Sequence, residues 1–144
     1  MEQRDFILRE IERIGVFLAG VRARILGRKA SLAEVRRDLF GAAARLGVDL
    51  DIAQKVSAET LVMMLTAGGA IEPTRCWFLA ESLYLEGLQA VAAVPPGEGE
   101  DLLLRARMLF ELLDRGNIRL AGVTEAGARI EEIDALLRGG PQAA

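Results

Sequence analysis

Apolar residues recur every three or four positions along most of this chain, and no run between turn residues alternates apolar and polar side chains as a strand would. The most regular run lies near the N-terminus, where successive steps are four, three, four, three and four residues: Ile7, Ile11, Ile14, Leu18, Val21 and Ile25. This heptad seam is typical of a helix that packs along another helix. It predicts a long amphipathic helix from Gln3 to Leu26, ended by Gly27.

Capping residues predict where the next two helices begin. Ser31 and Glu34 have the capping-box spacing, in which each side chain bonds the other residue's backbone amide, and this predicts a helix over 31–46. Asp49 or Ser57 can cap a third helical segment that ends near residue 67. The glycine pair after that segment breaks it.

Pro73 suits the first turn of a fourth helix, whose residues 76–94 are apolar on nearly every side. We expect this helix to be central. Residues 95–99, with two prolines and two glycines, predict a loop before a fifth helix over 100–114. Thr124 predicts the cap of a sixth helix over 125–138.

The size and composition of the chain suit one domain. Its 144 residues are 51% hydrophobic and 27% charged, enough for a core and a hydrated surface. We therefore predict an all-α fold, a compact bundle of about six helices. The single helical domain spans 1–138, with 1–28 as an N-terminal amphipathic oligomerisation helix, and 139–144 is a disordered tail.

Three observations favour a cytoplasmic protein. The longest apolar run near the N-terminus, 14–21, has eight residues, far short of the ~20 that span a bilayer. The first thirteen residues mix acids and bases, unlike a secretory signal. Cys76 is the only cysteine, so it cannot form an intrachain disulfide, and we expect it to be a small core residue.

Five acid-before-base pairs stand four residues apart, the spacing at which side chains meet on a helix surface. We expect them to mark the outer helix faces: Asp5–Arg9, Asp101–Arg105, Glu111–Arg115, Glu125–Arg129 and Asp134–Arg138.

The N-terminal run from Met1 to Glu12, MEQRDFILREIE, resembles the start of a family of short, functionally uncharacterised bacterial helical proteins. The resemblance implies a bacterial source and an all-α fold, and it implies no known activity.

Trp77, Glu81, Tyr84 and Gly87 follow the rhythm of the first helix of a tetratricopeptide repeat, although Glu81 stands where the repeat prefers glycine. The resemblance implies a single repeat-like hairpin, because no second copy occurs at a fixed period. On this reading Trp77 and Tyr84 could line a groove. The alternative is that these aromatic residues belong to the core.

The residue types in the chain favour binding over catalysis. Without histidine and with one cysteine, the chain cannot form a Ser-His-Asp triad, a Cys-His pair or the usual zinc sites. Neither phosphate-binding glycine motif is present. We expect no enzyme activity, no metal site and no cofactor.

The single basic cluster consists of Arg22, Arg24, Arg28 and Lys29, followed closely by Arg36 and Arg37. It contains no aromatic residue that could stack on bases and the pI is near 5.1, so we do not expect nucleic-acid binding. The cluster could instead contact an anionic partner or hold the first helix on an anionic membrane surface.

These observations give two hypotheses. The leading one is a protein–protein interaction module that self-associates into a homo-oligomer by burying the Ile7-to-Ile25 seam against a partner helix. The alternative is a peripheral membrane-surface adaptor that uses the same helix.

Overall fold

The computed structural model describes residues 2–93, 97–118, 120 and 123–139, without the side chains of 2–5, 7, 67, 92 and 93. Within this part of the chain the predicted all-α fold is confirmed. The elements are α1 (Glu2–Leu26), α2 (Leu32–Arg45), α3 (Leu50–Lys55), α4 (Ala58–Met64), β1 (Thr66–Ala67), β2 (Ala70–Ile71), α5 (Pro73–Ala93), α6 (Glu98–Arg115) and α7 (Ala126–Leu137).

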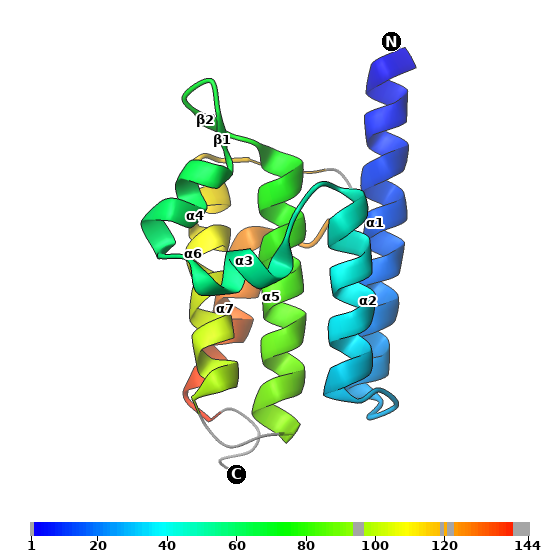
Figure 1. Cartoon of the computed structure of the whole chain (residues 1–144), viewed down its shortest axis with the longest axis vertical. Helices are drawn as coiled ribbons and strands as arrows, with labels where there is room; N and C mark the ends of the chain where they lie inside the picture. The colour runs from blue at the N-terminus through cyan, green and yellow to red at the C-terminus, as the bar shows by residue number, and fades with distance from the viewer. Residues whose placement is uncertain (1, 94–96, 119, 121–122, 140–144) are drawn as a thin grey trace.

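The long helices lie roughly parallel or antiparallel to one another (Figure 1). α1 and α2 form an antiparallel pair on one side of α5, and α6 and α7 lie on its other side. The first turns of α1 extend beyond the end of α2. The first turns of α1 therefore have fewer neighbours than the rest of the helix.

Helix α5 is the centre of the bundle, as its composition predicts. Every residue from 76 to 87 is buried, so the helix is enclosed on all faces over three turns. α6 packs closely on it because two glycines lie at the contact. A Cβ atom at Gly99 would lie 2.6 Å from the Val91 side chain, and one at Gly87 would lie 2.9 Å from Leu103.

The predicted caps explain the next part of the chain, with one correction. Ser31 and Glu34 form the predicted capping box. Asp49 and Ser57 both act as caps, so the single predicted third segment is two short helices, α3 and α4. The break predicted at Gly68 and Gly69 is the turn of a small hairpin, since both residues have positive φ, +61° and +84°.

Two predicted helix starts were wrong. α6 begins at Glu98, so Gly99 belongs to the helix and not to the preceding loop. α7 has Glu125 at its cap position without a side-chain cap bond, because Thr124 lies one residue too early. The predicted disordered tail lies outside the described residues from 140 on.

The structure also corrects the expectation that the N-terminal seam needs a second chain to cover it. Its described members, Ile11, Ile14, Leu18, Val21 and Ile25, are at most 7% exposed within one chain. α5 packs against α1, and α2 runs beside α1 in the bundle (Figure 1). The side chain of Ile7 lies outside the described part.

Candidate functional site

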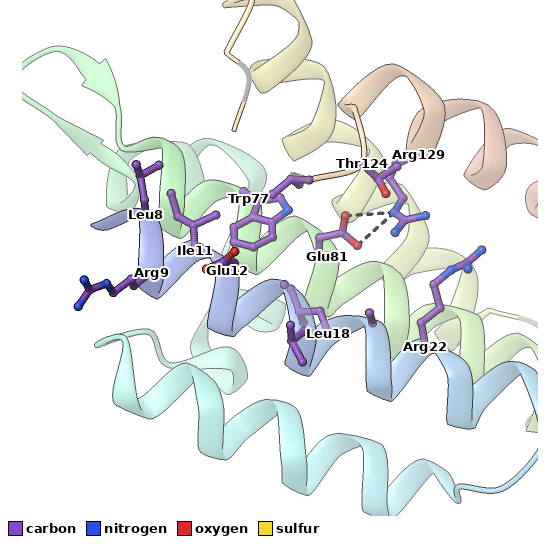
Figure 2. A pocket seen from close by; sticks show the side chains of 14 residues that line it. Leu8, Arg9, Ile11, Glu12, Leu18, Arg22, Trp77, Glu81, Thr124 and Arg129 are labelled. Carbon is purple, nitrogen blue, oxygen red and sulfur yellow. Dashed lines mark hydrogen bonds and ion pairs between the residues drawn. The ribbon is translucent and has the colours of Figure 1, made fainter. Parts of the chain in front are cut away.

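A surface groove of about 870 Å³ lies between α1, α5 and the segment that leads into α7 (Figure 2). We call it the Trp77 groove. It is lined by Leu8, Arg9, Ile11, Glu12, Gly15, Val16, Leu18, Ala19, Arg22, Trp77, Glu81, Val123, Thr124 and Arg129. The volume is in the range of sites that bind small ligands or several side chains of a partner.

The floor and the rim of the groove differ in exposure. Trp77 and Glu81 project from α5 and are buried at its floor. The rim on α1 carries exposed apolar side chains, because Val16 is 73% exposed and Leu8 is 44% exposed. Phe6, one turn before Arg9, is 66% exposed. Leu8 and Val16 thus leave apolar surface in water at the edge of the groove, whereas Phe6 does not line it.

Five side chains from three helices form a partly buried polar cluster at one end of the groove. We call Arg22, Glu81, Tyr84, Arg129 and Glu132 the ionic cluster. Nε of Arg129 lies 3.1 Å from each carboxylate oxygen of Glu81, and Nη1 of Arg129 donates to Glu132 at 2.9 Å. Nε of Arg22 donates to the Tyr84 hydroxyl at 3.1 Å, and Nη2 of Arg22 donates to Glu132 at 3.3 Å.

Tyr84 is the centre of this cluster. Its hydroxyl donates to Glu132, and the Arg129 guanidinium lies 4.8 Å from the centre of its ring, a cation–π distance. The cluster holds two arginines and two glutamates and is therefore electrically balanced. It joins α1, α5 and α7.

Burial and pairing act in opposite directions on the ionisable groups of the cluster. Burial raises the pKa of Glu81 above its ordinary value despite the contact with Arg129. Burial also raises the pKa of Tyr84, to about 12. For Glu132, burial favours the neutral form, but the hydrogen bond from Tyr84 and the charges of Arg129 and Arg22 together hold its pKa below the ordinary value.

The indole of Trp77 borders both the Trp77 groove and a neighbouring hollow. The side chain also lines a second hollow of about 430 Å³, which shares Val123 and Thr124 with the first. Its Nε1 atom is buried and has no hydrogen-bond partner among the residues that the structure describes. An unpaired buried donor costs about 1–3 kcal/mol, so this is a site where an acceptor from outside the described chain would stabilise the protein.

Comparisons of this chain with family models, curated proteins and solved structures gave no match. The two resemblances noted in the sequence therefore remain predictions.

The other predicted site residues are distributed over different environments. The predicted interface seam runs from Ile7 to Ile25, and its described members, from Ile11 on, belong to the core. Of the predicted groove residues, Trp77 lines the groove, whereas Tyr84 is fully buried beneath Arg22 and Arg129.

The structure divides the predicted basic cluster. Arg22 belongs to the ionic cluster, and Arg24 pairs with Asp38 at 2.7 Å. Arg28 and Lys29 are exposed at the turn after α1. The apolar face that the membrane hypothesis places in lipid is the buried seam. No helix among the described residues is long and apolar enough to cross a membrane.

The described residues offer few groups for catalysis. No group of three or more histidine, cysteine, aspartate or glutamate residues in the described part could hold a metal ion. Cys76 is buried, and burial raises the pKa of its thiol to about 12, so the reactive thiolate is disfavoured. The carboxylates of Glu81 and Glu132 both accept hydrogen bonds from Arg129.

The sequence analysis missed the ionic cluster. It placed Arg129 on an outer face as the partner of Glu125, but the Arg129 side chain is only 11% exposed and contacts Glu81. A signal was present, because Glu81 interrupts a helix that is predicted to be enclosed on all sides. A buried carboxylate requires a partner, although the sequence does not say which arginine supplies it.

Proposed function

We propose that this chain is a non-enzymatic protein-interaction module, which binds an apolar helical segment of another polypeptide chain in the Trp77 groove. One observation carries the proposal: exposed apolar side chains of α1 stand at the rim of an open groove whose floor is the indole of Trp77. Exposed apolar surface next to a groove is typical of helix-in-groove recognition.

The charges of the groove support a protein partner over a nucleic acid or an anionic lipid surface. Arg9 and Glu12 offset one another at the rim, and the ionic cluster is balanced. The groove lining carries three arginines and two glutamates, and an excess of one positive charge gives little attraction to a polyanion, whereas the groove suits a segment whose binding energy comes from apolar burial.

The described polar groups of the groove suit a binding role. Tyr84 holds its proton at neutral pH, and Glu81 is paired with Arg129, so neither is placed as a free base toward a bound substrate. Trp77 offers apolar area and one hydrogen-bond donor, the combination that is enriched at protein interfaces.

Site-specific photo-crosslinking tests the proposal. A benzophenone amino acid replaces Leu8 at the groove rim, and in a control chain it replaces Glu59, which is exposed on α4. In the cell from which the sequence comes, we expect a discrete protein adduct at position 8 and none at position 59. The adduct should disappear when Val16→Glu is added, because a charge at the rim opposes apolar burial.

Val16→Glu is a suitable probe because the native side chain is largely in water, so the change should alter stability by no more than about 0.5 kcal/mol. Equal adducts at positions 8 and 59, or an adduct at position 8 that survives Val16→Glu, would show that the groove does not bind a protein segment.

A further inference from the structure

We infer that the second hollow, beside the Trp77 groove, binds an uncharged and largely apolar small molecule whose oxygen accepts a hydrogen bond from Nε1 of Trp77. The hollow lies between α5, α6 and the residues that lead into α7, and its volume of about 430 Å³ is in the range of small-molecule sites. The inference does not depend on the proposed function, because none of the described residues that line this hollow belongs to α1.

The wall of the second hollow is largely apolar. Six of its described lining residues have hydrocarbon side chains: Phe110, Leu113, Ile118, Leu120, Val123 and Ala126. Phe110 and Leu113 are buried in the core on α6, so this part of the wall is held in place by the packing of the bundle. Such a wall favours a ligand with an apolar body.

The indole of Trp77 supplies the polar group that orients a ligand in the hollow. Its N–H donor is buried and has no acceptor among the described residues. Figure 2 shows the indole nitrogen on the edge of the ring toward Thr124, which lines the second hollow. A buried donor without an acceptor is costly, so a ligand oxygen that accepts from it removes this cost and adds a hydrogen bond.

The donor is covered in the free protein, so the side chains beside it must turn when the oxygen arrives. Rotation of side chains on binding is common. Thr124 is exposed and has room to turn.

The charged residues of the second hollow disfavour an anionic ligand. The described lining includes Asp114 and Glu125 and no arginine or lysine. A carboxylate or phosphate would meet no basic partner among these residues, and one indole N–H does not neutralise a charge. The oxygen of a ketone, amide or ether needs no cation. The ligand class is therefore an uncharged molecule with an apolar body and an acceptor oxygen.

Nuclear magnetic resonance tests the inference directly, because the isotope-labelled full chain has one tryptophan and gives one indole N–H signal. The probe is cyclohexanone, and its control is methylenecyclohexane, which has the same shape with a CH₂ group in place of the oxygen. We expect cyclohexanone to move the indole proton signal downfield until it saturates, because a proton that enters a hydrogen bond is deshielded. Methylenecyclohexane should cause no downfield shift, and cyclohexanecarboxylate should leave the signal in place.

Two matched substitutions show which cavity the probe occupies. Ala126 lines the second hollow and Ala19 lines the Trp77 groove, and neither lines the other cavity. Ala126→Leu fills part of the second hollow and should weaken cyclohexanone binding by about tenfold or more. Ala19→Leu should leave the binding unchanged. The backbone signals of the same spectrum report whether each variant is folded.

Three results would overturn the inference: an indole signal that cyclohexanone does not move, equal downfield shifts from cyclohexanone and methylenecyclohexane, or a shift that Ala19→Leu abolishes and a folded Ala126→Leu retains. The comparison of the two probes uses the natural chain, so it decides the question even if Ala126→Leu does not fold.

Discussion

Breaking the buried pair between Glu81 and Arg129 should be among the most damaging single changes that leave the core intact. The two side chains are 5% and 11% exposed, and both carboxylate oxygens lie 3.1 Å from one guanidinium nitrogen. Arg129→Met keeps the length and apolar character of the stem but leaves the carboxylate buried without a cation. Removing one partner of a buried ion pair typically costs about 3–5 kcal/mol.

The loss should be measurable in the folded protein, because domains of this size have about 5–15 kcal/mol of stability. With a urea dependence of about 2 kcal/mol/M, the unfolding midpoint should fall by roughly 2 M. Trp77 is the only tryptophan and lies near the pair, so its fluorescence reports the transition together with far-UV circular dichroism.

The double variant Glu81→Met with Arg129→Met supplies the control. Replacing both members of a buried pair with apolar residues of similar size is often neutral or stabilising by about 1–4 kcal/mol. We therefore expect the double variant to be at least as stable as the natural chain to within about 1 kcal/mol. If Arg129→Met costs less than about 1 kcal/mol, or the double variant is as unstable as the single one, the pair is not electrostatically isolated from water.

The pH dependence of Arg129→Met follows from the pKa of Glu81. Burial raises this pKa in the folded state above the value of 4.5 for an exposed glutamate, and the loss of Arg129 raises it further. A raised acid pKa gives stability that is present below the unfolded pKa and is lost as the pH rises through the folded one. The deficit of Arg129→Met should therefore shrink as the pH falls through the raised folded-state pKa values, above 4.5, and should level off below 4.5; a deficit that grows in acid would refute this account.

Gly99→Ala should lower the free energy of unfolding by about 1–3 kcal/mol, since the added Cβ would lie 2.7 Å from the Val91 backbone nitrogen. Gly41→Ala on α2 places its Cβ in open space and should raise the free energy of unfolding by about 0.5–1 kcal/mol. Urea titration checks both, and equal effects would contradict the close α5–α6 contact. Burial raises the pKa of Glu86, so this group favours the fold below its unfolded pKa and loses that contribution as the pH rises through the folded one. Glu86→Gln should therefore flatten the fall in stability as the pH rises above 4.5, and an unchanged profile counts against this account. Cys76 should react with a thiol reagent only as fast as the protein opens, and rapid labelling in native buffer would show that it is not enclosed.

Local signals predicted the helices well because each depends on neighbouring residues. The capping box at Ser31 and the cap at Asp49 involve contacts three residues apart, which a sequence displays directly. The predicted start of α6 was wrong because glycine is a poor helix former, and Gly99 lies in the helix because the packing of α6 on α5 requires a small residue there. The small residue lets α5 approach, and that requirement is invisible without the partner helix.

The ionic cluster was harder to predict because its members are far apart in the sequence. Arg22, Tyr84 and Glu132 lie on three helices. The sequence separation is 62 for Arg22 and Tyr84 and 48 for Tyr84 and Glu132. The local rule for acid and base four residues apart made Arg129 a surface residue. Tertiary contact with a buried carboxylate outweighs such a pair, since a surface pair is worth only about 0.2–0.5 kcal/mol and an unpaired buried charge costs several.

The spacing of apolar residues in α1 shows that one face of the helix is covered, but it does not show which chain covers it. A heptad seam has the same appearance whether the facing helix belongs to the same molecule or to another. The seam from Ile11 to Ile25 is covered by its own chain, so the apolar side chains that α1 leaves in water are others, Leu8 and Val16 at the groove among them. Since the seam is already enclosed, a partner that leaves the Trp77 groove would uncover only side chains that are exposed in the monomer, and the bundle would stay folded. The binding proposed for the groove should therefore be reversible and separable from folding, which the buried seam could not provide.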